Sequence, residues 1–136
     1  MLFNPKESID LQGNTGPFIQ YTYARIQSIF RKLKEENFQI SQDKFESLDA
    51  IEKELVVLLN QYPTIVEIAA DTYSPSEVAN YIYALAKKFN TFYVDHSIAK
   101  AETESKKHLR ADIALNVSVV IKHGLILLGI SVPERM

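Results

Sequence analysis

Apolar side chains recur every three or four residues between residues 78 and 92, which is the spacing of one buried face of an α-helix. The repeating positions are Val78, Tyr81, Ile82, Leu85, Phe89 and Phe92. The preceding residues 74–77 (SPSE) place a serine at the cap position, a proline at the first helical position and a glutamate three residues after the cap. We therefore predict a helix from Pro75 to about Tyr93 that forms the densest part of the core.

The same spacing predicts helices on both sides of this segment. We expect them at about residues 17–33, 49–62, 64–73 and 102–123, with a polar connector at residues 34–47. The predicted buried positions are Ile19, Tyr23, Ile26, Phe30 and Leu33 in the first helix and Leu109, Ile113, Val117, Val120 and Ile121 in the last.

Local signals mark two of the helix ends. Asp49 and Glu52 have the spacing of a capping box at the start of the second helix. Gly124 is expected to end or kink the last helix.

The length and composition fit one helical domain. A chain of 136 residues with 46% apolar content buries about two-thirds of its unfolded surface, which is enough for one core. We predict an all-α bundle of about five or six helices, with residues 1–16 as an irregular loop and residues 17–136 as the helical domain.

The composition also limits the cellular setting. The chain has no cysteine, so disulfides and thiolate metal sites are excluded. Its apolar runs are shorter than the about 18 residues that a spanning helix needs, and its first residues lack the pattern of a signal peptide. We expect a soluble, cytoplasmic protein without membrane attachment.

The net charge of −2 conceals an uneven distribution. Residues 1–34 sum to +3, residues 35–77 to −8 and residues 78–136 to +3. If the two basic ends fold together, a surface that attracts phosphates can form on a slightly acidic protein. The alternative is that the acidic residues only solvate a linker.

The sequence shows no apparatus for catalysis or for metal binding. The glycine pair Gly13 and Gly16 is not followed by a lysine or preceded by a strand, so it does not read as a nucleotide-binding loop. His96, His108 and His123 are too far apart in sequence for a helical metal pair. We predict that these histidines are ordinary polar residues and that the chain has no catalytic residue.

Tyr21 and Arg25 are the clearest candidates for ligand contact, because they lie four residues apart on one face of the first helix. A phenol ring beside a guanidinium can stack an unpaired base and hold a phosphate or a base edge. Tyr93 at the end of the 75–93 helix invites the same interpretation. Core packing is the alternative for both tyrosines.

The terminal residues are also candidates. Leu125, Leu127, Leu128 and Ile130 are expected to pack the chain end onto the core, which would fix Met136 on the surface.

Three separated motifs resemble the arginyl-tRNA synthetase family, a class I aminoacyl-tRNA synthetase. They are TGPFIQYTYAR at residues 15–25, YIYALAKKFNTFY at residues 81–93 and LGISVPERM at residues 128–136. RADIAL at residues 110–115 stands where the family has its DALR-type helix. The resemblance covers essentially the whole chain and implies the carboxy-terminal, helical anticodon-binding domain, which reads the middle cytosine of arginine anticodons.

Carried over residue by residue, the resemblance implies that Tyr21, Arg25, Tyr93 and Met136 contact the anticodon. It also implies that the loop of Gly13, Asn14, Thr15 and Gly16 reaches the same tRNA region. Two departures affect the first helix, where Phe18 replaces a commoner tyrosine and Tyr23 a usual histidine.

The HIGH and KMSKS signatures of class I synthetases are absent from these residues. We therefore expect a piece of a longer enzyme, inactive alone, with Met1 as a native start or an internal residue and with ATP and Mg²⁺ used only by the parent. The implied partners are arginine tRNA and the parent's catalytic domain, and we expect a monomer. The alternative function is a helical protein-interaction or scaffold domain, whose binding would depend little on salt.

Overall fold

The computed structural model describes residues 16–41, 47–133 and 135. This part of the chain folds into five helices and contains no strand. The helices are α2 (Gly16–Glu35), α3 (Ala50–Asn60), α4 (Tyr62–Asp71), α5 (Pro75–Asp95) and α6 (Glu104–Leu127). The predicted all-α bundle is confirmed.

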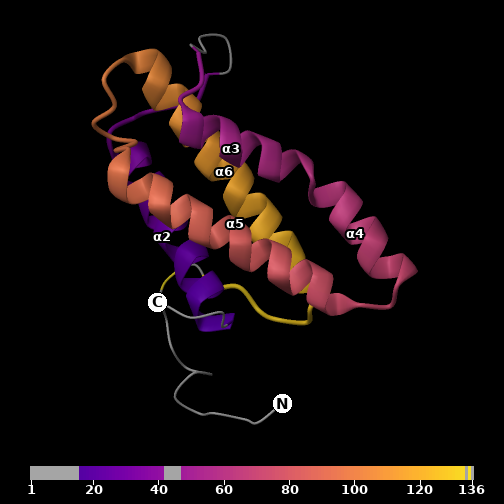
Figure 1. The fold of residues 1–136 in the computed structure, drawn as a ribbon. Helices are drawn as coiled ribbons and strands as arrows, with labels where there is room; N and C mark the ends of the chain where they lie inside the picture. Colours follow the sequence, from indigo (N-terminus) through magenta and orange to yellow (C-terminus); the bar gives the residue numbers. More distant parts are fainter. Residues whose placement is uncertain (1–15, 42–46, 134, 136) are drawn as a thin grey trace.

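Helices α5 and α6 pack along each other and form the centre of the bundle (Figure 1). Both contact α2 on one side and α3 on another, while α4 continues the direction of α3 and covers the first part of α5. This arrangement brings α2 and the end of α5 together, although more than 50 residues separate them in the sequence.

The core is built from the faces that the periodicity predicts. All six predicted positions of α5 are buried, and Phe89 and Phe92 are fully covered. One predicted position in each of α2 and α6 is wrong, because Phe30 and Val120 are only partly buried, and Ile29 is buried in the place of Phe30.

Two predicted helix starts are correct, but only one uses the expected contact. The Glu52 carboxylate accepts a hydrogen bond from the Asp49 backbone N–H at 2.8 Å, as a capping box requires. Helix α5 begins at Pro75, yet the Ser74 hydroxyl does not cap it and instead shares a hydrogen bond of 2.8 Å with the Ser76 hydroxyl.

The prediction that Gly124 ends or kinks the last helix is wrong as to the end, because α6 continues to Leu127. A Cβ atom on Gly124 would lie 2.6 Å from Cγ2 of Ile82, so the glycine allows α6 to approach α5 closely. The terminating glycine is Gly129, whose φ of +75° suits the left-handed position after a helix. The Ile130 N–H then donates to the Leu125 carbonyl at 2.9 Å.

The packing predicted for the chain end is partly correct. Leu125 is buried, and Leu128 and Ile130 pack against the core. Leu127 is 52% exposed, because it lies on the outer face of the last turn of α6.

Candidate nucleic-acid interface

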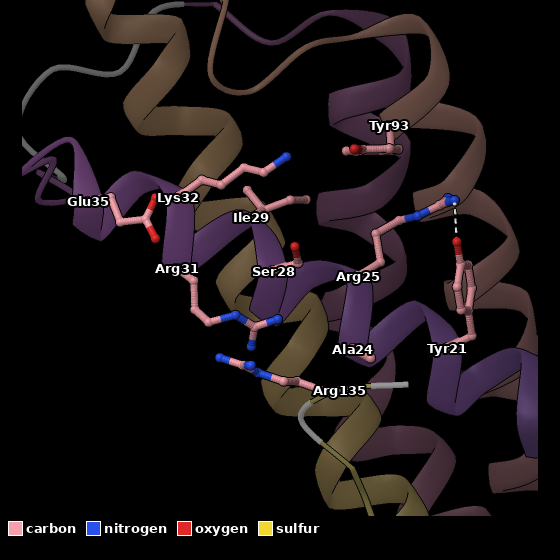
Figure 2. A pocket seen from close by; sticks show the side chains of 10 residues that line it. All are labelled: Tyr21, Ala24, Arg25, Ser28, Ile29, Arg31, Lys32, Glu35, Tyr93 and Arg135. Atoms are coloured by element: carbon pink, nitrogen blue, oxygen red, sulfur yellow. Dashed lines mark hydrogen bonds between the residues drawn. The ribbon is translucent and has the colours of Figure 1, made fainter.

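The Arg25 guanidinium contacts two tyrosine rings from different helices (Figure 2). Its central carbon lies 5.0 Å from the ring centre of Tyr21 on α2 and 4.9 Å from that of Tyr93 on α5. Nη2 of Arg25 also donates to the Tyr21 hydroxyl at 3.1 Å. Cation–π contacts of this kind hold a guanidinium by the electrostatic attraction of the ring faces.

The two rings differ in how they are supported. Tyr93 stacks on the buried ring of Phe89 at a centroid distance of 6.3 Å, so it is anchored to the core. Tyr21 is 38% exposed, which leaves ring surface available to a ligand. The buried neighbour Tyr23 faces the core, as the periodicity predicts.

Tyr21, Arg25 and Tyr93 line a pocket of about 670 Å³. Arg31, Lys32, Glu35 and Arg135 also line it, and Figure 2 shows Lys32 extending toward Tyr93 and Arg31 and Arg135 reaching toward one another. The lining thus contains four cationic side chains and one carboxylate. A pocket with this charge attracts anions, although the protein as a whole is slightly acidic.

Only some of the predicted site residues lie in this pocket. Tyr21, Arg25 and Tyr93 lie together in the pocket. Met136 and the loop residues Gly13, Asn14 and Thr15 lie outside the described residues, and Gly16 is the first residue of α2.

Sequence reasoning missed four residues of this region: Asn90, Arg31, Lys32 and Arg135. The positive charge of the two end segments was a signal for the three basic residues, because Arg31 and Lys32 belong to one of these segments and Arg135 to the other. Both segments contribute to the lining of this pocket. Asn90 gave no signal of its own, because an asparagine in a helix is usually solvated.

A second polar cluster is buried where α6 meets the start of α3. The fully buried Glu52 carboxylate pairs with Lys106 Nζ at 2.7 Å and with Arg110 Nε at 2.9 Å. Arg110 also contacts Glu102 at 3.1 Å and donates to the Ser97 carbonyl at 3.0 Å. Burial alone would raise the pKa of Glu52, but the hydrogen bonds from Lys106, the Asp49 N–H and Arg110 outweigh it and hold the pKa below its ordinary value.

This cluster is internally paired, so its role is structural. It joins α3, α6 and the segment after α5. The sequence interpretation assigned Glu52 only to a capping box and Arg110 only to a DALR-type helix, and it gave Lys106 no role. Buried charges of this kind persist because each has a partner.

The histidines take part in side-chain contacts within the bundle. The Tyr62 hydroxyl lies 2.6 Å from Nδ1 of His123, and Nδ1 of His108 accepts from the Ser41 backbone N–H at 2.9 Å. Within the described residues, no group of three or more His, Cys, Asp or Glu side chains could hold a metal ion. In that part of the chain, none of the helices has the length and apolarity needed to cross a membrane.

Comparisons with known proteins identify the family of this chain. The family described as DALR anticodon binding domain matches residues 19–136. The chain is 49% identical over 138 residues to the arginine–tRNA ligase of Bacteroides thetaiotaomicron, and 50% identical over 136 residues to that of Flavobacterium psychrophilum. Both alignments cover 100% of this chain, but only 23% and 22% of those relatives.

A solved structure supports the same assignment. The arginyl-tRNA synthetase of Thermus thermophilus matches 98% of this chain with a TM-score of 0.89 and 28% sequence identity, over 23% of that protein. The chain therefore spans less than a quarter of the length of these relatives. Since the family match extends along almost the whole helical bundle, this chain belongs to the DALR anticodon binding domain family.

Proposed function

We propose that this chain recognises the anticodon loop of arginine tRNA on behalf of an ATP-dependent arginine–tRNA ligase. The observation that carries the proposal is the Arg25 guanidinium held against the rings of Tyr21 and Tyr93 in the lining of a cationic pocket. The relatives named arginine–tRNA ligase supply the amino-acid identity of the tRNA.

The pocket suits an unpaired nucleotide in two ways. An exposed ring face such as that of Tyr21 contributes about 1 to 3 kcal/mol when a base stacks on it. The other cationic side chains of the lining, among them Lys32 and Arg135, attract the phosphates of the neighbouring nucleotides.

Arg25 gives this pocket a means to distinguish cytosine from uracil. A guanidinium has five N–H donors and no acceptor. Cytosine offers two adjacent acceptors, O2 and N3, on its Watson–Crick edge, whereas uracil places an N–H at position 3. Arg25 therefore favours cytosine at the middle position of the anticodon, where a uracil N–H would face another donor.

Several parts of the proposal concern residues and domains beyond this pocket. Met136 and the loop of Gly13, Asn14, Thr15 and Gly16 are retained as proposed tRNA contacts. ATP and Mg²⁺ would be used by the remaining three-quarters of the parent enzyme. That enzyme would be a cytoplasmic monomer in which this domain packs against the catalytic domain.

Titration with an arginine anticodon stem-loop tests this function. Arg25→Ala is expected to weaken binding by about 1 to 3 kcal/mol. Arg25→Lys keeps the charge but loses the planar fork, so it should retain the salt dependence and lose most of the preference for cytosine. Lys122→Ala, at an exposed position of α6 outside the pocket lining, is the control and should bind as the unaltered chain does.

Salt dependence separates this function from a protein-interaction role. Binding through phosphates falls steeply between low and moderate salt, whereas binding in an apolar groove changes little. Equal affinity of Arg25→Ala and the unaltered chain for the stem-loop would contradict the proposal.

A further inference from the structure

We propose that Asn90 is a positioning residue that holds the Arg25 guanidinium in the orientation needed to read a base. The inference rests on the proposed function, and it adds a residue that does not itself contact the RNA. Asn90 lies on α5, three residues before Tyr93, and its Oδ1 accepts a hydrogen bond from Nη1 of Arg25 at 2.6 Å. This contact links α2 to α5 across 65 residues of sequence.

The orientation of the Asn90 amide is determined by its other contacts. Its Nδ2 donates to the Thr22 hydroxyl at 2.8 Å and to the Ala86 carbonyl at 2.9 Å. If the amide turned over, Nδ2 would face the guanidinium, donor against donor, and Oδ1 would face the Ala86 carbonyl, acceptor against acceptor. Only one orientation therefore satisfies the amide, and it points the oxygen at Arg25.

Thr22 helps to fix the orientation of the Asn90 amide. The residue is fully buried, and its hydroxyl donates to the Phe18 carbonyl at 3.0 Å while it accepts from Asn90. The hydrogen bond to the α2 backbone thus fixes the direction of the hydroxyl, so that its oxygen is free to accept from Asn90. The chain of contacts runs from the α2 backbone through Thr22 and Asn90 to Arg25.

The result is a guanidinium that is fixed but not neutralised. Arg25 has five N–H groups, of which one donates to Asn90 and one to the Tyr21 hydroxyl. The ring centres of Tyr21 and Tyr93 lie within 5.0 Å of the central carbon of the guanidinium. Three N–H groups remain for a ligand within these described contacts. An aspartate at position 90 would supply a similar acceptor, but its charge would offset that of Arg25 and its second oxygen would face the Ala86 carbonyl.

A double-mutant cycle tests the inference on the 136-residue chain with stem-loops that carry cytosine or uracil at the middle position. Asn90→Ala should lower the preference for cytosine about tenfold, the effect of one charge-assisted hydrogen bond. In the Arg25→Ala background the same change should have no further effect, because Asn90 acts through Arg25. Equal effects of Asn90→Ala in both backgrounds, or no effect in either, would overturn the inference.

Matched variants separate positioning from stability. Asn116 on α6 makes the corresponding bond to the carbonyl four residues earlier, at 2.8 Å, so Asn116→Ala is a control that should leave the preference unchanged. Thr22→Val keeps the volume and removes the hydroxyl, and it should lower the preference in the same direction as Asn90→Ala. If Asn90→Ala does not fold, the result of Thr22→Val decides: an unchanged preference overturns the inference.

Failure of the proposed function would be seen separately, as equal binding of both stem-loops by the unaltered chain. In that case the NMR signals of the Arg25 Nη–H groups decide about Asn90 without RNA, because the bonds to Asn90 and Tyr21 restrict rotation of these groups. The inference predicts sharp, separately resolved Nη–H signals that broaden in Asn90→Ala and persist in Asn116→Ala. A signal that is the same in all three proteins would contradict it.

Discussion

Replacing Glu52 with glutamine keeps the size of the side chain and removes its charge from between Lys106 and Arg110. Removing one partner of a buried ion pair costs about 3 to 5 kcal/mol. The lower end of this range applies here, because Lys106 keeps the Ser47 carbonyl at 2.7 Å and Arg110 keeps the Ser97 carbonyl at 3.0 Å. We therefore expect a loss of about 3 kcal/mol in the free energy of unfolding, or about 10 °C in Tm for a domain of this size.

The same variant predicts a change in acid stability. The pKa of Glu52 in the folded chain lies below its ordinary value of 4.5, so the unfolded chain binds the proton first as the pH falls. The stability that Glu52 contributes is therefore complete above about pH 4.5 and is lost as the pH falls through the lower pKa of the folded state. Glu52→Gln should lose this part of the pH dependence.

Urea unfolding followed by circular dichroism, between pH 3 and pH 7, measures both effects (the range is set by the ordinary carboxyl pKa values of about 4). Glu54→Gln is the matched control, because Glu54 is exposed and pairs with Lys88 at 2.9 Å on the surface. It should cost less than about 1 kcal/mol. The reasoning is refuted if Glu52→Gln unfolds like the unaltered chain and shows the same loss of stability in acid.

Further predictions concern packing, a buried hydroxyl and the pocket. Gly124→Ala should lower the free energy of unfolding by about 1 to 3 kcal/mol in thermal melts, because its Cβ would lie 2.6 Å from Cγ2 of the fully buried Ile82; an unchanged Tm would contradict the close packing of α5 and α6. Tyr81→Phe should lower the free energy of unfolding by about 1 kcal/mol, because it loses the 2.6 Å hydrogen bond from the Tyr81 hydroxyl to the Leu58 carbonyl. Since burial raises the pKa of Tyr81 to about 12, Tyr81 should be the last tyrosine to ionise in an alkaline ultraviolet titration of the unaltered chain. Arg135→Ala should reduce the logarithmic salt slope of stem-loop binding by about one unit, and an unchanged slope would show that Arg135 contacts no phosphate.

The helical periodicity was sufficient to predict most of the core, because a helix with one buried face has apolar residues every three or four positions in the sequence. Gly124 shows where this reasoning ends. A glycine near the end of a helical pattern suits a helix terminus, but the same residue type also suits a close contact between helices, and only the position of Ile82 distinguishes the two.

The candidate site shows the same division. Tyr21 and Arg25 share a helix face, so their proximity follows from a spacing of four residues. The contact of Arg25 with Tyr93 and Asn90 depends on how α2 packs against α5, and the pairing of Glu52 with Arg110 depends on how α3 packs against α6. Local spacing carries no information on such contacts between distant segments.

We propose that the middle base of an arginine anticodon rests against Tyr21 with its Watson–Crick edge toward Arg25. Intermolecular NOEs in the complex of the chain with an arginine anticodon stem-loop test this most directly. We predict NOEs from H5 and H6 of the middle cytosine to the ring protons of Tyr21, together with a shifted Arg25 Nε–H signal. NOEs that place this cytosine on another face of the bundle, with the Tyr21 and Arg25 signals unchanged, would refute the proposed contact.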